Sequence, residues 1–410
     1  MFAIKRELKL NNKQQTLMAK HSGFSRLVYN YGLSLYSQLD HNEFKGVATK
    51  KIGAIKKVLT NYTSTKPEFA WMKQLSSKVY QSALQDLQSA FGRFFKGLGK
   101  YPVFKRKKDS CSFTVYSGNG VVVLAAGNKI KIPTIGTFTL KEPLAARYVT
   151  QTFTVSKKGS KWFVAFSVNA QRIPPLFHEN AKVGIDLGVK CFATLSDGTT
   201  YDSEALATLG ASAPKPYKQA RTKLGQLQWR NRNKQLGNRR QGILKSKNAA
   251  KYYVKLANQN ASLSSQRRDF LQKTTTEISK KYATIRIEDL NVSGMVANHK
   301  LSAAISDLGF YEFRRQLVYK QVPYGTKVEI VDRWYPSSKT CSCCGHIQPM
   351  PLRERVFDCQ QCGIQIDRDL NASINLENAP ENKVGRASSE LNACGEVGAD
   401  TPRRSRKRTP

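Results

Sequence analysis

The spacing of apolar residues changes twice along the first 170 positions. Residues 1–10 alternate between apolar and charged side chains, which is the period of a half-buried strand. From residue 12 to about 95 the apolar positions recur at helical spacing, and Pro67 caps or separates helices. Short strand-like runs follow at 112–116, 121–124, 129–132, 136–140, 153–156 and 162–168. We therefore expect a small antiparallel β-barrel, made of residues 1–11 and 101–175, into which a helical block at 12–100 is inserted.

A second domain begins after the linker Ile173-Pro-Pro-Leu. Its predicted elements are, in chain order, strands at 182–187 and 191–195 with a hairpin turn at Asp197-Gly198, a basic helical stretch at 215–281, a strand at 284–288, a helix at 306–322, a strand at 327–331 and a closing helix from Leu370. This order is typical of an RNase H-like α/β domain, here 181–335 and 366–381. The fold class is therefore a multidomain α+β chain. The tail, 382–410, is rich in Gly, Ser and Arg and is expected to be disordered.

Net charge restricts the function more than any other property of the composition. The chain has 67 Lys and Arg against 29 Asp and Glu, a formal net charge of +38, whereas a soluble domain usually carries only about 2–8. The excess predicts a polyanionic partner, most simply nucleic acid. Stretch 215–281 alone has 18 basic residues against Asp269 and Glu277. Its candidate nucleic-acid contacts are Arg230, Arg232, Arg239 and Arg240.

A basic run behind an aromatic residue is a further candidate phosphate contact. It follows Phe104 and consists of Lys105, Arg106, Lys107 and Lys108. No apolar leader follows Met1 and no run of 18 apolar residues occurs, so we expect neither secretion nor a membrane partner. Four scattered cysteines fit a reducing cytoplasm better than a disulfide framework: Cys111, Cys191, Cys343 and Cys394.

The other four cysteines form two knuckles near the C-terminus. Cys341 and Cys344 are separated by two residues, as are Cys359 and Cys362, and a glycine follows each pair. Two such turns facing each other give the tetrahedral four-sulfur site that zinc prefers. All four ligand positions are filled, so the zinc of this ribbon, residues 336–365, is structural. Cys343 and His346 are less suitable ligands because only the other cysteines match the two-residue spacing.

Three acids lie in or at the ends of predicted strands and helices of the RNase H-like domain. Asp186 lies in the first strand and is followed by Gly188, which would let a phosphate backbone approach; Glu288 ends a later strand, and Asp369 begins the last helix. Three carboxylates can hold the pair of Mg²⁺ or Mn²⁺ ions that phosphodiester hydrolysis uses. Taken singly, each acid has a simple structural explanation as a turn former, a surface acid or an N-cap. The acids most easily confused with them are Asp289, Asp332 and Asp367.

In combination, the motifs around these residues resemble the TnpB (OrfB) proteins of bacterial insertion sequences, over essentially the whole chain. The motifs are Lys100-Tyr-Pro-x-Phe-Lys, Gly184-Ile-Asp186-Leu-Gly188, Ile287-Glu288-Asp-Leu-Asn291, Ser338-Lys-Thr-Cys341-Ser-x-Cys344-Gly, Cys359-x-x-Cys362-Gly and Asp367-Arg-Asp369-x-Asn371-Ala. The resemblance implies a wedge barrel, an inserted helical recognition lobe and a RuvC-like nuclease domain with a zinc-ribbon insert. It also implies that Asp186, Glu288 and Asp369 are catalytic. Asp369 is preferred to Asp367 because the family's third acid lies two residues before the Asn.

The resemblance further implies an RNA-guided DNA endonuclease, related to the type V CRISPR effectors. Its partners would be a guide RNA and double-stranded DNA, with no small-molecule substrate and no need of a protein oligomer, and its location the bacterial cytoplasm. A short transposon-adjacent motif would be read near the boundary of lobe and barrel, where Lys78, Gln81 and Thr114 are candidates.

Two other functions are weaker. A nuclease-inactive RNA-guided repressor would have lost a carboxylate, and all three are present. A tyrosine transposase would have a His-x-His metal pair, whereas the five histidines are isolated.

Overall fold

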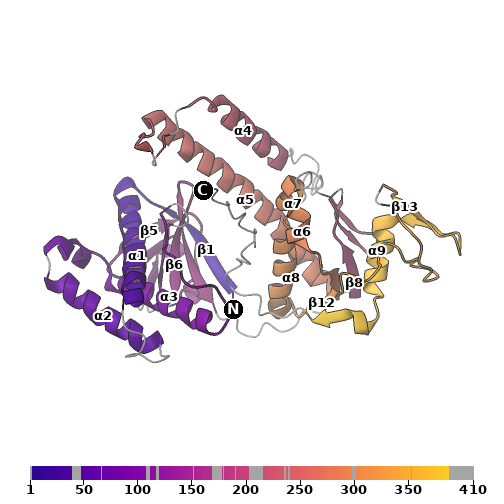
Figure 1. Ribbon diagram of the computed structural model, residues 1–410, viewed down its shortest axis with the longest axis horizontal. Coiled ribbons are helices and arrows are strands. Elements are labelled where there is room, and N and C mark those ends of the chain that lie inside the picture. The colour runs from indigo at the N-terminus through magenta and orange to yellow at the C-terminus, as the bar shows by residue number, and fades with distance from the viewer. Residues whose placement is uncertain are drawn as a thin grey trace, which may run out of the picture. The chain divides into compact units, whose positions relative to one another are not determined.

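The computed structural model describes most of the chain and divides into two compact units (Figure 1). The described residues are 2–38, 48–65, 67–107, 111–116, 120–150, 152–168, 178, 180–189, 191–202, 216–234, 237–238, 241–297, 302–351 and 353–386. Unit 1 contains residues 1–170 and 235–258, and unit 2 contains 171–234 and 259–410. Helix α5 (Lys247–Lys281) belongs to both. No helix among the described residues is both long enough and apolar enough to span a membrane.

Unit 1 is built on a seven-stranded antiparallel sheet. Its strands are β1 (Phe2–Lys9), β2 (Ser112–Val115), β3 (Val122–Leu124), β4 (Lys129–Ile132), β5 (Gly136–Leu140), β6 (Phe153–Lys158) and β7 (Lys161–Val168). The spatial order is β2-β6-β7-β1-β5-β4-β3. Strand β1 thus lies between β7 and β5, although most of the unit separates it from them in sequence. The N-terminal strand, which the sequence assigned to a barrel with residues 101–175, lies in the interior of this open sheet.

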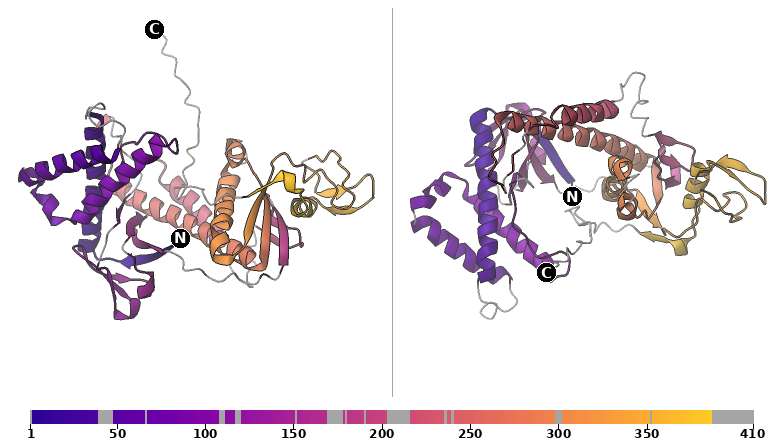
Figure 2. Two further views of the ribbon diagram at one scale, coloured as in Figure 1. Left: turned by 90° about the horizontal axis from the view of Figure 1, so that it is seen from below. Right: turned by 45° about the horizontal axis from the view of Figure 1, so that its top comes forward.

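The helical block follows β1 and precedes β2, as the pattern predicted. It consists of α1 (Asn12–Gln38), α2 (Ala48–Thr65), the 3-10 helix η1 (Pro67–Gln74) and α3 (Ser77–Phe95). The α-helices pack against one another (Figure 2). The fully buried side chains of Leu87 and Phe91 lie at their centre. Two further 3-10 turns, η2 (Ala125–Gly127) and η3 (Ala146–Tyr148), lie between strands.

The predicted closure of this sheet into a barrel is wrong. Strands β2 and β3 are the two edges of the sheet and are not paired with each other. The helical block instead satisfies polar backbone groups around β2: Ser22 donates to the carbonyl of Ser112 at 3.3 Å, and the amide of Tyr116 donates to Ser82 at 3.1 Å. An edge whose backbone groups are bonded in this way does not need a partner strand.

Unit 2 is an α/β unit with a six-stranded mixed sheet. Its strands, in the spatial order, are β10 (Thr200–Asp202), β9 (Cys191–Leu195), β8 (Asn180–Asp186), β11 (Tyr282–Glu288), β12 (Lys327–Val331) and β15 (Val384–Arg386). Strands β8, β11 and β12 are parallel, and the other three pair antiparallel with their neighbours. The helices are α4 (Pro216–Arg230), α5, α6 (Val292–Ala297), α7 (Ser302–Leu308), α8 (Phe310–Tyr324) and α9 (Arg368–Glu377).

The two faces of the parallel strands pack on different helices, which Figure 1 shows to the left and right of β8. One face joins α5 and α8 in a core that includes Val183, Ile185, Ile285 and Ile287. The other face packs on α9. A Cβ at Gly184 would lie 2.0 Å from the carbonyl oxygen of Ser373, so only glycine lets α9 approach this closely. Beside it, Arg286 donates to the carbonyls of Glu377 at 3.0 Å and Ala379 at 2.6 Å, at the end of α9.

Several predicted boundaries differ from the structure. The stretch predicted to be helical at 215–281 forms two helices, α4 and α5, and the described residues between them are not α-helical. The helix predicted at 306–322 is interrupted by Gly309, whose positive φ of 73° separates α7 from α8. Residues 384–386, which the sequence placed in the tail, form β15, and the short 3-10 helix η6 (Glu381–Lys383) leads into it. Strand β15 pairs with β12 and covers its edge. Sequence pattern does not reveal a three-residue strand, because so short a run has no recognisable period.

Candidate metal centres and nucleic-acid contacts

Asp186, Glu288 and Asp369 are brought to one edge of the unit 2 sheet. Asp186 ends β8 and Glu288 ends the neighbouring parallel strand β11, so both lie at the carboxyl edge. Side chains alternate along a strand, and therefore Asp186 points to the same face as Gly184 and Glu288 to the same face as Arg286. That face packs on α9, and Asp369 is the second residue of this helix.

The pKa shifts of Asp186 and Glu288 agree with this placement. Burial raises the pKa of Asp186 to about 7, and the negative charges of Asp369 and Glu288 add to the rise. Burial also raises the pKa of Glu288, as does the charge of Asp289, while Arg333 lowers it. The acids thus repel one another, which is the condition that a divalent cation relieves. Carboxylate oxygens are also the ligands that Mg²⁺ prefers.

The three acids that are most easily confused with these have other partners. Asp289 accepts from Arg314 at 2.6 Å and from Arg333, and these hydrogen bonds outweigh its burial and lower its pKa. Asp332 accepts from the amide of Trp334 at 2.7 Å. Asp367 is the N-cap of α9 and accepts from the amide of Asp369 at 2.9 Å. Each of these carboxylates therefore has a local structural role.

The structure gives Gly188 a different role from the predicted one. A Cβ at this position would lie 2.8 Å from the carbonyl oxygen of Cys191 and 4.0 Å from Oδ2 of Asp369. The amide of Gly188 also donates to the carbonyl of Phe192 at 3.3 Å. The glycine is thus required for a tight turn of the chain upon itself, between β8 and β9. Approach of a phosphate backbone is not needed to explain it.

The four predicted zinc ligands form one cluster in the described part of the chain. The sulfur atoms of Cys341, Cys344, Cys359 and Cys362 all lie within 4.8 Å of one another. Cys341 and Cys362 are 3.6 Å apart, as are Cys344 and Cys359. Cys343 and His346 do not belong to the cluster, as the spacing predicted. The seven described cysteines are free thiols.

The two knuckles have the same backbone geometry. The amide of Gly345 donates to the backbone carbonyl of Cys341 at 3.0 Å, and the amide of Gly363 donates to the backbone carbonyl of Cys359 at 2.9 Å. The φ angles of the two glycines are 75° and 74°. Each glycine thus occupies the left-handed region that a side chain disfavours. The second knuckle closes the hairpin of β13 (Val356–Asp358) and β14 (Gln365–Asp367). Four converging thiols with closed geometry fit a structural zinc ion.

Two buried amides join the first knuckle to the helix that carries Asp369. Asn371 donates to the carbonyl of Thr340 at 2.8 Å and accepts from the amide of Ser342 at 2.9 Å. One helical turn later, Asn375 donates to Thr340 at 2.6 Å and to Ser337 at 2.8 Å. The sequence motif contains Asn371 but does not indicate that its amide binds the knuckle. The signal in the sequence is the pair of asparagines four residues apart, which lie on one face of a helix.

Removal of zinc should therefore also disturb the carboxylate site and impair cleavage. We expect one tightly held zinc per chain, and its loss in a Cys359→Ser/Cys362→Ser double variant, because a closed thiolate site contributes folding energy. Metal analysis of the purified proteins measures this. Cleavage should be lost together with protection of the 340–375 backbone in hydrogen exchange, since Asn371 and Asn375 bond to that knuckle. Cys343→Ser is the matched control and should keep its zinc; full retention in the double variant would contradict the assignment.

The candidates for motif reading gather on neighbouring elements of unit 1. Lys78 and Gln81 are exposed and one helical turn apart on α3. Thr114 lies on β2, which packs against α3, and its hydroxyl is 3.0 Å from that of Thr154. Tyr116 joins the two elements by donating to Asp86 at 2.7 Å. The role of the three side chains in reading DNA stays a prediction.

The candidate phosphate contacts differ in their exposure and in the partners that they already have. Lys105 lies 3.5 Å from Asp86 and 4.0 Å from the ring centre of Tyr29, so its charge already has partners inside unit 1. Arg232 stacks on Trp229, with 3.8 Å between the guanidinium carbon and the ring centre. The remaining described candidates are exposed, namely Arg106, Lys107 and Arg230. The others lie outside the described residues, namely Lys108, Arg239 and Arg240.

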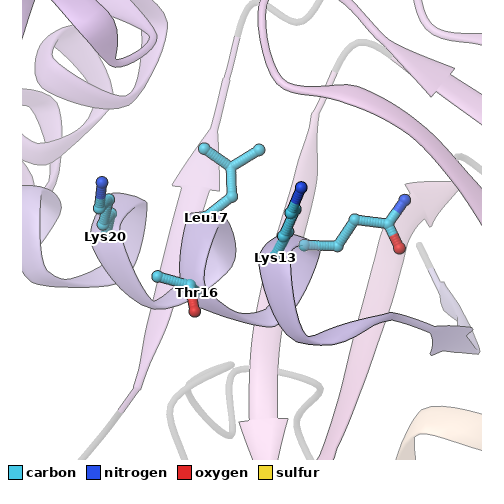
Figure 3. Close-up of a pocket in the computed structure, with 5 residues that line it drawn as sticks. Lys13, Thr16, Leu17 and Lys20 are labelled. Carbon is cyan, nitrogen blue, oxygen red and sulfur yellow. The ribbon is translucent and has the colours of Figure 1, made fainter.

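A surface hollow of about 310 Å³ lies on α1 in unit 1 (Figure 3). It is lined by Lys13, Gln14, Thr16, Leu17 and Lys20. No acid or cysteine lines it, so it offers no ligand set for the metals discussed above. The cations of this hollow come from one helix face and add to the basic surface of the chain.

Comparisons with known proteins agree with this arrangement. Family models match residues 310–376 ("Cas12f1-like, TNB domain"), 165–299 ("Probable transposase") and 1–39 ("Helix-turn-helix domain"). A protein of Streptomyces pristinaespiralis named "Putative RNA-guided DNA endonuclease" is 32% identical over 392 residues, 94% of this chain and 89% of its own. InsQ of Escherichia coli K12, which carries the same description, is 29% identical and covers 96% and 94%.

The fold is similar to that of a solved Cas12f1 structure. A structure titled as a Cas12f1-sgRNA-target DNA complex matches with a TM-score of 0.50 and 15% identity, covering 89% of this chain and 82% of that one. Given its extended similarity to the Streptomyces protein, the chain belongs to the TnpB (OrfB) family. The name of the third family model does not describe the structure here, because residues 2–9 form a strand and residues 12–38 a single helix.

Proposed function

We propose that this protein is a transposon-encoded, RNA-guided DNA endonuclease. The observation that carries the proposal is the placement of Asp186, Glu288 and Asp369 at one sheet edge, where the charges of the other two acids raise the pKa of Asp186, in a chain that belongs to the TnpB family. Relatives over nearly its whole length are named as RNA-guided DNA endonucleases. On this reading unit 2 is a RuvC-like domain with an inserted zinc ribbon at 336–365. In unit 1, residues 12–100 are a recognition lobe inserted into the wedge domain of 1–11 and 101–175.

The residues present fit a divalent-metal site. Asp186, Glu288 and Asp369 would hold Mg²⁺ or Mn²⁺ through carboxylate oxygens. Such ions activate water and neutralise the leaving oxygen in phosphodiester hydrolysis. The chain's own contribution is to fix the three carboxylates. Gly184 lets α9 pack closely on the sheet, and Arg286 binds the carbonyl groups at the end of α9. The N-cap Asp367 and the hydrogen bonds of Asn371 to the first knuckle fix the first turn of α9, which carries Asp369.

The large positive charge supports guide-directed binding. Such a protein must hold an RNA, a heteroduplex and a displaced strand through phosphates and helix shape rather than through base identity. A net charge of +38 and the basic stretch at 215–281 suit that task. Reading of the adjacent motif is assigned to Lys78, Gln81 and Thr114. A cytoplasmic location stays a prediction from the scattered cysteines.

The guide dependence of targeting tests this function. Full-length protein should be expressed with its flanking transposon-end DNA, and the RNA that copurifies with it sequenced. Changing the target-pairing part of that RNA should redirect cleavage to the matching DNA, because pairing supplies the sequence information. Protein without RNA should bind DNA with little sequence preference, because protein side chains are assigned only the short adjacent motif and guide pairing reads the rest. If cleavage stays at the original site after the guide is changed, the RNA-guided mechanism is wrong.

A further inference from the structure

Trp334 is an exposed tryptophan whose place the fold does not explain. Its side chain is 85% exposed, which is more than for any other large apolar residue described in unit 2. A tryptophan left in water contributes no burial energy to the fold. The next residue behaves differently: Tyr335 is partly buried and packs on the cluster of Val331 and Leu376. The turn therefore buries one aromatic side chain and displays the other.

The turn that carries Trp334 is held by several hydrogen bonds. The amide of Trp334 donates to Oδ1 of Asp332 at 2.7 Å, and the amide of Tyr335 donates to the carbonyl of Asp332 at 2.9 Å. The amide of Asp332 in turn donates to the carbonyl of Lys383 at 2.9 Å. The indole is thus displayed on a turn whose backbone is already ordered, which lowers the entropy cost of binding a ligand.

This turn lies at the same sheet edge as the carboxylate site. It begins directly after Val331, the last residue of β12, and Val331 pairs with Glu288. Neighbouring strands are about 4.8 Å apart, so the turn lies roughly one strand from Glu288 and two from Asp186. A strand of DNA bound at these acids therefore lies within reach of the turn.

Trp334 lies next to a partly exposed cation. Arg333 and Arg314 both donate to Asp289, and Arg333 also faces the negative charges of Asp332 and Glu288, so the charges around this turn are mixed. The side chain of Arg333 is 42% exposed. An aromatic face next to a partly exposed cation is the combination that proteins use to bind unpaired nucleotides, with the base stacked and the phosphate attracted.

We propose that Trp334 stacks on an unpaired base of the DNA strand that enters the carboxylate site, and so positions that strand for cleavage. The proposal rests on the nuclease function proposed above. A stacking contact of this kind tolerates any base, because every base has a π-face. It would hold the strand at the edge of the sheet without adding sequence preference, which leaves specificity to guide pairing.

Three substitutions separate stacking from simple hydrophobic contact. In the guide-loaded full-length protein, Trp334→Ala and Trp334→Leu should slow single-turnover cleavage by about five- to 150-fold, the range of base–aromatic stacking. Trp334→Tyr should stay within a few-fold of the parent because it keeps an aromatic face. Target binding, zinc content and thermal unfolding should be unchanged in all three. Equal activity of the Leu and Tyr variants, or parental activity of Trp334→Ala, would overturn the proposal.

Substrates with one abasic nucleotide locate the stacked base. Scanned through the positions around the cut, an abasic site should slow the parent protein most at one or two positions. With Trp334→Ala, the cleavage rate should not fall at those positions, because the stacking contact is already absent. Purely additive losses would show that the two changes act independently and that no stacking occurs.

A crosslinking readout keeps this inference distinct from the nuclease function. A single-stranded oligodeoxynucleotide carrying 5-iodouracil should crosslink to the peptide that contains Trp334 when irradiated with the guide-loaded protein. If the parent protein cleaves guide-selected DNA and the crosslink falls elsewhere, the stacking inference fails alone. If the crosslink forms at Trp334 and no guide-selected cleavage occurs, the proposed nuclease function fails, and Trp334 is still a contact for single-stranded DNA.

Discussion

Replacing Asp186 by alanine should abolish DNA cleavage while guide-directed binding of the target stays largely intact. Glu288→Gln and Asp369→Ala should do the same. Each change removes a ligand from a site at which bound metal is worth several kcal/mol in the transition state, so the rate should fall by about a thousandfold or more. Binding should survive, because the heteroduplex is held mainly through its phosphates by the basic surface. Cleavage of labelled target DNA and gel-shift assays measure the two effects.

Asp367→Ala is the matched control for the third acid. Asp367 caps α9 through the amides of Asp369 and Leu370, and loss of an N-cap typically costs about 1 kcal/mol of stability. The variant should therefore unfold at a slightly lower temperature and keep substantial activity in Mg²⁺. An inactive Asp367→Ala beside an active Asp369→Ala would move the third ligand by two residues. An active Asp186→Ala would reject the RuvC-like mechanism.

Gly184→Ala should impair cleavage although it changes no charged or metal-binding group. The new methyl carbon would lie 2.0 Å from the carbonyl oxygen of Ser373 and 2.4 Å from the amide nitrogen of Glu377. Both are backbone atoms, so α9 must move away from β8. Overpacking of this kind costs about 1–3 kcal/mol, and a displacement of about 1 Å in a catalytic group can cost about a hundredfold in rate. Because Asp369 moves with α9, the cleavage rate should fall about a hundredfold at unchanged target binding.

Gly385→Ala is the control for this effect. Gly385 lies on β15 of the same sheet, and its added Cβ would lie 3.9 Å from the carbonyl oxygen of Ile330, an ordinary contact. This variant should keep parental activity and a parental unfolding temperature. If Gly184→Ala is as active as Gly385→Ala, the close packing of α9 on β8 does not position Asp369.

Local pattern predicted most of the elements and failed where pairing had to be known. The run at 129–132 alternates strictly and forms a strand with those bounds, and the helical spacing from Asn12 to Phe95 yields α1, α2 and α3. Whether the unit 1 sheet closes into a barrel could not be predicted from the local sequence pattern. It depends on whether two edge strands meet, and the helical block bonds the backbone of one of them instead.

The sequence by itself determined the chemistry that this protein can carry. The two-residue cysteine spacing specifies a tetrahedral sulfur site, and the net charge of +38 specifies a polyanionic partner, because both depend only on residue type and local order. It also supplied Asp186, Glu288 and Asp369 as candidates, through motifs that resemble a known family.

Only the tertiary structure decided how those candidates are held together. Nothing local relates Gly184 to Ser373 or Asn371 to Thr340, since each pair is brought together by chain segments far apart in sequence. The parallel pairing of β8 with β11 sets Asp186 beside Glu288, and the seating of α9 on the same face adds Asp369. The separate tasks of Asp367 as a cap and Trp334 as an exposed side chain likewise follow from packing. Burial and partnership are properties of the folded chain, and residue type alone does not fix them.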